Sequence, residues 1–83
     1  MTTRIYVLNV PENKGLIKVA SRDAVISVDM VGPYYRITAD DDDIVIDRRA
    51  TGCRHAVWYS AIAGLEDSII VQQDKDALRV TAR

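Results

Sequence analysis

The sequence predicts an α+β fold, with an antiparallel sheet of about seven short strands in hairpins and one α-helix near residues 52–64. Two observations predict the strands: short apolar runs alternate with polar residues, and turn-forming residues separate the runs. A third predicts the helix, because apolar residues recur at helical spacing between residues 53 and 63. Strands that are adjacent in sequence favour antiparallel pairing. The helix would then cover a curved sheet or plug a partly open barrel.

A hairpin pattern occurs twice, in residues 23–39 and in residues 67–82. Each copy is an apolar, β-branched run, then a turn, then Arg-Ile-Thr-Ala or Arg-Val-Thr-Ala. The shared positions are Asp23/Asp67, Ile26/Ile70, Arg36/Arg79, Thr38/Thr81 and Ala39/Ala82. The pattern predicts two hairpins. It has two explanations, an internal duplication or the reuse of the same residue types by unrelated hairpins.

Four strands are expected in the first half of the chain. Pro11 and Gly15 bound a turn between the first two, and Gly32-Pro33 turns the chain between the last two. The third strand alternates clearly, with its apolar side chains on one face and Ser27 and Asp29 on the other. The expected strands are residues 4–10, 16–20, 24–30 and 34–39.

The second half is expected to hold the helix and three further strands. A polar loop over residues 40–43 leads into a short strand, after which Thr51 is a candidate N-cap, because its hydroxyl can accept a bond from a free amide. The helix would follow over residues 53–63 and end at Gly64 in a left-handed conformation. The expected strands are residues 44–47, 69–73 and 77–82, the last two forming a hairpin.

Size and composition indicate one domain spanning residues 1–83. The apolar fraction of 48% is ordinary for a globular domain and too high for disorder. Phe is absent, so aliphatic residues, Tyr and the one Trp must fill the core. Small domains of this kind often gain stability by forming oligomers or by docking on a larger partner.

The charge and the cysteine count exclude several classes of function. A net charge of −1 gives no basic field for nucleic acid and no polybasic membrane anchor. One Cys and one His cannot form a disulfide or supply a four-ligand zinc site within one chain. No signal peptide and no membrane span of about 20 apolar residues is apparent. We therefore expect a cytoplasmic protein without a cofactor.

The strongest candidate for an anion site or an interface is the cluster Arg48, Arg49, Arg54 and His55 at the expected helix start. Free amides at a helix N-terminus attract anions such as phosphate or carboxylate groups. The alternative interpretation is that these arginines balance the neighbouring acidic residues 40–43 and Asp47. Exposed charge clusters contribute little and usually mark no site.

Other candidates for chemistry are weaker. Cys53 and His55 lie two residues apart and would point to opposite sides of a helix, which argues against a catalytic pair. The acidic run at residues 40–43 lacks the spacing and the glutamate of a calcium-binding loop. No nucleophile–base arrangement or phosphate-binding loop occurs. The sequence therefore supplies no catalytic residues and no metal ligands.

Two aromatic pairs, Tyr34-Tyr35 and Trp58-Tyr59, are candidates for an interface, where Tyr and Trp are enriched. Strand alternation places Tyr35 inside, and the apolar neighbours of Trp58 do the same for that side chain. Tyr34 and Tyr59 are then the outer members, available to a partner.

We therefore expect a small non-catalytic interaction module, an accessory subunit or protein inhibitor that docks on a larger protein. The first alternative is a homo-oligomeric ligand-binding protein or enzyme with an anion site between subunits, since 83 residues do not easily enclose a pocket. The second alternative is nucleic-acid binding through the local arginine patch, which the overall charge does not favour.

Overall fold

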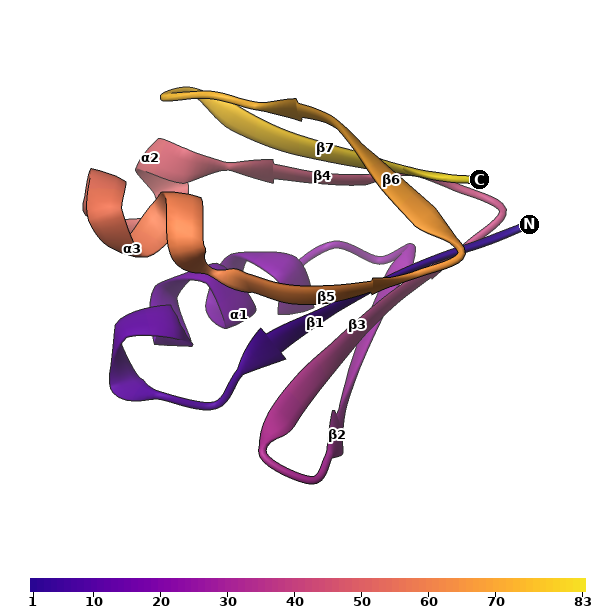
Figure 1. Ribbon diagram of the computed structural model, residues 1–83, viewed down its shortest axis with the longest axis horizontal. Coiled ribbons are helices and arrows are strands. Elements are labelled where there is room, and N and C mark those ends of the chain that lie inside the picture. Colours follow the sequence, from indigo (N-terminus) through magenta and orange to yellow (C-terminus); the bar gives the residue numbers. More distant parts are fainter.

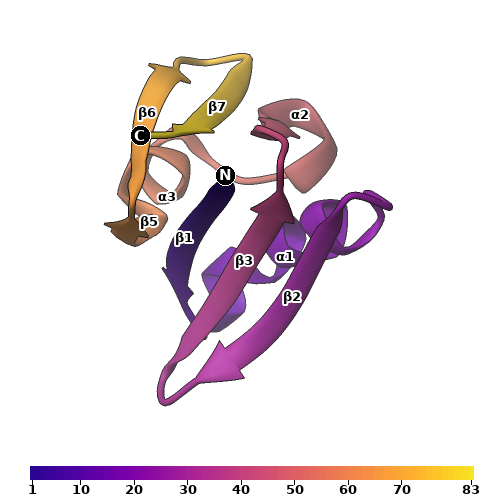
Figure 2. The ribbon, with the colours of Figure 1, turned by 90° about the vertical axis from the view of Figure 1, so that its right-hand side faces the viewer.

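Two antiparallel sheets pack across one core in the computed structural model, which describes residues 1–83 (Figures 1 and 2). The larger sheet has the strand order β2-β3-β1-β5, and the smaller has the order β4-β7-β6. The predicted α+β class with antiparallel strands is confirmed, and the sheets do not close into a barrel. The strands are β1 (Thr2–Leu8), β2 (Ile26–Val31), β3 (Tyr34–Asp40), β4 (Ile44–Asp47), β5 (Ile62–Glu66), β6 (Ser68–Gln73) and β7 (Ala77–Ala82).

The core forms because successive side chains of a strand point to opposite faces of its sheet. Every second residue of the central strands is therefore buried between the two sheets. Trp58 is fully buried in the same cluster and supplies the largest core side chain. The alternating strand residues of the core include Ile5, Val7, Ile37, Ala39, Ile44, Ile46, Leu78 and Val80.

The expected strand over residues 16–20 is wrong, because this segment lies in a helix, α1 (Lys14–Ser21), that follows a 3-10 turn, η1 (Pro11–Asn13). Pro11 occupies the first turn of η1, where its missing amide costs nothing. Buried Leu16, Ile17 and Ala20 recur at helical spacing. The same apolar letters fit a short strand, and only packing decides between the two.

The single helix expected near residues 52–64 is also corrected. The region holds two short helices, α2 (Arg48–Thr51) and α3 (His55–Ser60), and then strand β5. Thr51 is not an N-cap: it ends α2 and its hydroxyl donates to the Arg48 carbonyl, while Gly52 takes a left-handed φ of 71°. Gly64 is not a helix cap either, since it lies within β5 opposite Tyr6 of β1.

Both repeated segments form hairpins, β2–β3 and β6–β7, as the sequence pattern predicts. In each half of the chain, a strand is followed by helix and then by the hairpin, whose second strand pairs with the first strand of that half. The ion pairs of the two arginines are not equivalent, because Arg36 binds Asp29 within its own hairpin and Arg79 binds Asp43 just before β4. The shared order of elements fits an internal duplication, with β5 added to the second half, and equally fits two unrelated hairpins.

The helices lie at the sides and ends of the two sheets. Helix α1 packs against β2, β4 and α2, and so closes one side between the sheets. Helix α3 lies beside the β6–β7 turn, where Trp58 Nε1 donates to the Asp74 carbonyl at 2.7 Å. None of the helices is long and apolar enough to span a membrane, the longest being α1 with eight residues.

Candidate functional site

Arg48 is bound to the protein's own backbone. Its guanidinium donates through Nε to the Lys75 carbonyl and through Nη1 to the Cys53 carbonyl at 3.2 Å. These bonds tie α2 to the β6–β7 turn and to the loop before α3. The Arg48 side chain therefore has a structural task that its position in the sequence did not indicate.

Arg49 and Arg54 are exposed, and their side chains make no hydrogen bond or ion pair. The acidic run does not face them, since Asp43 binds Arg79 and Asp41 binds the amino group of Met1. The ion pairs of this run are therefore formed with Met1 and Arg79 and not with the two arginines. Helices α2 and α3 have four and six residues, too short for an anion site based on a helix dipole.

Cys53 and His55 do not form a pair. Cys53 is only 6% exposed, in the loop between α2 and α3, with its sulfur 3.8 Å from the Glu12 carbonyl oxygen. His55 is exposed at the start of α3, and its ring lies against Tyr59 with the ring centroids 6.5 Å apart. Cys53 is thus a small core residue.

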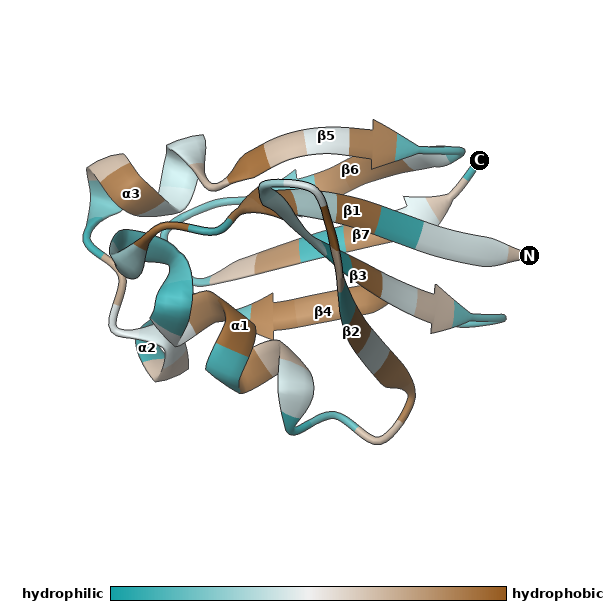
Figure 3. Cartoon of the chain, turned by 90° about the horizontal axis from the view of Figure 1, so that it is seen from below, coloured by the Kyte–Doolittle hydropathy of each residue, from teal (hydrophilic) through white to brown (hydrophobic).

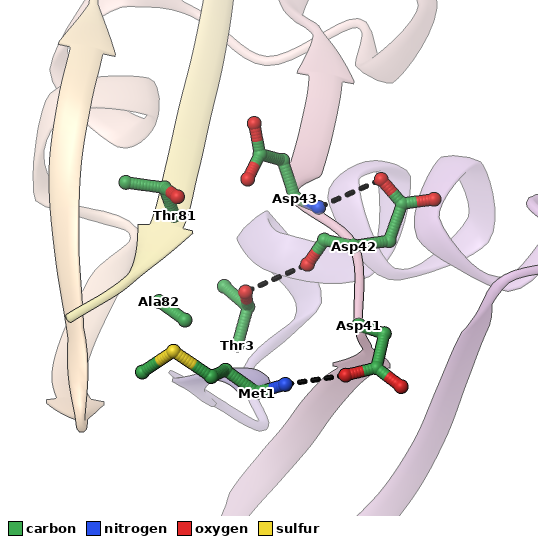
Figure 4. A pocket seen from close by; sticks show the side chains of 7 residues that line it. All are labelled: Met1, Thr3, Asp41, Asp42, Asp43, Thr81 and Ala82. Carbon is green, nitrogen blue, oxygen red and sulfur yellow. Dashed lines mark hydrogen bonds and ion pairs between the residues drawn. The ribbon is translucent and has the colours of Figure 1, made fainter.

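The acidic run borders a shallow hollow of about 260 Å³ (Figure 4). The Met1 amino group binds Asp41, the Thr3 hydroxyl donates to the Asp42 carbonyl at 2.7 Å, and the Asp42 carboxylate accepts from the Asp43 amide at 2.8 Å. These contacts fix the β3–β4 loop against the start of β1. Nowhere in the chain do three Asp, Glu, His or Cys side chains converge to hold a metal ion.

The outer face of the four-stranded sheet carries a charged row across its middle. Arg36 on β3 binds Asp29 on β2, with Nε 3.0 Å from Oδ1, and this hydrogen bond lowers the pKa of Asp29. Arg4 on β1 binds Glu66 on β5, and the Tyr6 hydroxyl donates to Glu66 at 3.1 Å. Both donors lower the pKa of Glu66. The row is therefore internally neutralised.

Beyond this row, the same face ends in apolar side chains. Val31, Tyr34 and Leu8 lie side by side on β2, β3 and β1. Tyr34 is 37% exposed, and next to it opens a hollow of about 410 Å³. The hollow is lined by Tyr6, Val31, Tyr34, Ala63 and Gly64.

The hollow exists because of the chain geometry of β5. Tyr6 pairs with Gly64 and Val7 pairs with Ile62, so Ala63 is the extra residue of a bulge. Gly64 has no side chain to cover the Tyr6 ring, and a Cβ there would lie 3.9 Å from Tyr6 Cδ2. The space over Tyr6 thus follows from one glycine and one bulge.

Sequence reasoning identified Tyr34 but not the other four residues of the hollow. Their proximity depends on the pairing of β5 with β1, which joins residues about 60 positions apart, as in Arg4 with Glu66. Tyr59 is 51% exposed but lies on α3, and both ribbon views place α3 and the β2–β3 turn at different corners (Figures 1 and 2). Tyr34 and Tyr59 thus belong to separate surfaces.

Comparisons with protein-family models, with curated proteins and with solved structures find no match.

Proposed function

We propose that this protein is a non-catalytic interaction module, an accessory subunit or inhibitor, that docks on a larger protein through the apolar end of its four-stranded sheet. The observation that carries the proposal is the hollow beside Tyr34, which lies next to a charged row with no free charge. Binding energy at protein interfaces concentrates where a large side chain fills such a hollow, and Tyr is among the preferred residues.

The surroundings of the hollow define the partner's chemistry. Because Asp29 is paired with Arg36 and Glu66 with Arg4, a charged partner would have to compete with existing ion pairs. An apolar side chain inserted over Tyr6, flanked by uncharged residues, meets no such competition. We therefore expect a partner that contributes an aliphatic or aromatic anchor, and binding that depends weakly on salt.

Four carboxylates are held in structural contacts and are not suited to act as general acids, which need a raised pKa. The pKa values of Asp29, Asp41, Glu66 and Asp74 are all lowered. The causes are ion pairs for the first three and backbone amides of the β6–β7 turn for Asp74. Each of these carboxylates is held in its charged form by a structural contact.

The test is a Gly64→Leu variant, whose side chain fills the hollow over the Tyr6 ring. A photo-crosslinking residue at Leu8, which is 39% exposed beside Tyr34, identifies the partner in cells of the source. The dissociation constant of the purified pair is then measured by calorimetry. We expect Gly64→Leu to raise it at least about tenfold, as for the loss of a central contact.

Tyr59→Ala on α3 is the matched control, and its binding should equal that of the wild type. Thermal melting must show that both variants are folded. The proposal fails if no protein is crosslinked from Leu8 in stoichiometric amount, or if Gly64→Leu binds that protein as tightly as Tyr59→Ala does. A steep loss of affinity with salt would contradict the apolar anchor.

A further inference from the structure

Helix α1 carries a row of positive charge on its outer face. Lys14, Lys18 and the C-cap residue Arg22 recur at four-residue spacing, so they lie along one face, about 6 Å apart along the helix axis. All three are exposed, whereas the buried residues of α1 are apolar. Like charges at this spacing repel one another, and no acidic residue of α1 offsets them. Figure 3 shows hydrophilic bands between the hydrophobic ones on α1.

Helix α2 lies side by side with α1 and adds to the positive charge. Gly15 on α1 and Thr51 on α2 are in direct contact. Arg49 on α2 and Arg54 shortly after it are exposed, and α2 contains no acidic residue. We call the five exposed cations of this region the cationic helix surface: Lys14, Lys18, Arg22, Arg49 and Arg54.

None of these five cations has a carboxylate partner. The ion pairs of the chain instead involve Arg4, Arg36, Lys75, Arg79 and the amino group of Met1. Lys14 donates only to uncharged groups, the Asn9 side chain at 3.3 Å and the Tyr35 hydroxyl at 2.9 Å. An anion that binds to this surface therefore breaks no existing ion pair.

The acidic loop between β3 and β4 lies at the other end of the molecule. Figure 1 shows α2 and α3 at one end of the longest axis, and this loop beside the N-terminus at the other. Near the helices, Asp23 and Asp47 accept bonds from backbone amides, as Asp74 does in the β6–β7 turn, and Asp76 pairs with Lys75. The net charge of −1 therefore combines a helical end where positive charge prevails with an acidic opposite end.

An exposed aromatic pair adjoins Arg54. The loop that holds Arg54 is packed on the chain before α1, with the Cys53 sulfur 3.8 Å from the Glu12 carbonyl oxygen. The next residue, His55, has its ring centroid 6.5 Å from that of Tyr59, and both side chains are at the surface. Exposed aromatic rings beside cations are the arrangement on which the bases of a single strand stack.

We propose that the cationic helix surface binds the phosphate backbone of single-stranded nucleic acid without reading its base sequence. Lys and Arg side chains neutralise phosphates and release the counterions around them, which supplies most of the free energy of such binding. A single strand is the occupant that also uses the aromatic pair, because its unpaired bases can stack on Tyr59. A duplex keeps its bases stacked on one another, and an acidic peptide need not carry a ring.

The number of cations sets the salt dependence of binding. Each phosphate neutralised on a single strand contributes about −0.7 to the slope of log K against log salt. Contacts from all five cations therefore give a slope of about −3.5. We expect a dissociation constant on the order of 1–100 μM at low salt, in the range of sequence-independent binding.

Fluorescence anisotropy of a labelled oligothymidylate of about 12 nucleotides tests the proposal on the full chain, between about 50 and 200 mM salt. The double variant Lys18→Gln, Arg22→Gln should raise the dissociation constant at least about tenfold at the lowest salt and make the slope less steep by about 1.4. The control is Arg79→Gln, Arg83→Gln, which makes the same change in net charge at two exposed side chains on β7 and at its end. It should leave both quantities unchanged.

The stacking contact has its own variant. Tyr59→Ala should raise the dissociation constant at least about fivefold and leave the salt slope as in the wild type, because a ring carries no charge. An unchanged affinity of Tyr59→Ala would overturn the choice of a single strand. Thermal melting of each variant must match the wild type, so that a loss of affinity reports on binding.

Three further outcomes would overturn the proposal. The first is a wild type that leaves the anisotropy unchanged up to about 1 mM protein, above the expected range. The second is an equal loss of affinity in the control and in the Lys18→Gln, Arg22→Gln variant. The third is tighter binding of a duplex of the same length, or of polyglutamate as a competitor. Since the hollow beside Tyr34 lies on another surface and its binding should depend weakly on salt, the docking function can hold or fail independently.

Discussion

Gly15 on α1 lies directly against the backbone of Thr51 on α2. A Cβ atom at position 15 would fall 1.9 Å from the Thr51 carbonyl oxygen and 3.0 Å from the carbonyl carbon. Both atoms belong to backbone, so no side-chain rotation relieves the overlap. The packing of α1 on α2, and with it the closure of one side of the core, depends on the absence of a side chain at Gly15.

We therefore expect Gly15→Ala to lower the free energy of unfolding by about 1–3 kcal/mol, the usual range for an overpacked contact. Urea denaturation measures the change. The control is Gly64→Ala, whose Cβ would meet only the Tyr6 side chain at 3.9 Å or more and should change stability by no more than about 0.5 kcal/mol. Equal stability of the two variants would contradict the close approach of α1 and α2.

Trp58 combines full burial with a hydrogen bond from its indole to the Asp74 carbonyl at 2.7 Å. Trp58→Phe keeps most of the apolar volume but leaves this carbonyl without its donor. We expect a loss of about 1–3 kcal/mol, from the missing hydrogen bond and from the space that the smaller ring leaves in the core. Guanidinium denaturation followed by circular dichroism measures it. Tyr59→Phe, an equally small change at an exposed neighbour, should have no measurable effect, and a similar effect of both changes would refute this role of the indole.

Acid should weaken the charged row of the four-stranded sheet. Arg36 lowers the pKa of Asp29 below its ordinary 3.8, and Arg4 with Tyr6 lowers that of Glu66 below 4.5. The folded state thus binds these protons less tightly than the unfolded state. The stabilisation is complete above the ordinary pKa values and is lost as the pH falls through the lowered ones.

The melting temperature of the wild type should therefore drop between about pH 5 and pH 3. A variant with both Asp29→Asn and Glu66→Gln should melt lower at pH 7 and lose less on acidification. Glu12→Gln, at a carboxylate without an ion pair, should follow the wild-type curve. If the double variant has the same pH dependence as the wild type, the two ion pairs do not contribute to stability.

Arg48 and Arg54 should differ in how much their side chains contribute to the stability of the fold. Arg48 donates to two backbone carbonyls, so Arg48→Ala should cost about 0.5–1.5 kcal/mol of stability for each hydrogen bond lost. Arg54→Ala removes a side chain without a partner and should change stability by less than about 0.5 kcal/mol. Thermal denaturation of both variants measures these losses of stability. A larger loss for Arg54→Ala than for Arg48→Ala would contradict the structural role of Arg48.

Local patterns in the sequence were sufficient for most strands. Residues 34–39 alternate between apolar and polar side chains, residues 44–47 are a short apolar run that ends at Asp47, and both segments form strands. They did not identify α1, because Leu16, Ile17 and Ala20 fit a short strand as well as a short helix. Pro11 before them was the available signal for a helix start.

The candidate site was predictable only at Tyr34. Strand alternation places Tyr34 on the face opposite Tyr35, and the structure leaves it at the surface. The hollow beside it also needs Tyr6 from β1 and Gly64 from β5, which meet through long-range pairing. Nothing in the sequence near Tyr6 or near Gly64 indicates that these two residues, so far apart along the chain, lie side by side.

By itself, the sequence determined the α+β class, the antiparallel hairpins and the inner and outer faces of most strands, since these follow from the two-residue period of extended chain. Tertiary structure decided the rest. Three features depend on which apolar surfaces can be buried together. They are the helical conformation of residues 16–20, the position of β5 beside β1, and the division of the strands into two sheets. Such burial is a property of the whole chain, because the hydrophobic effect has no direction and selects among locally acceptable conformations.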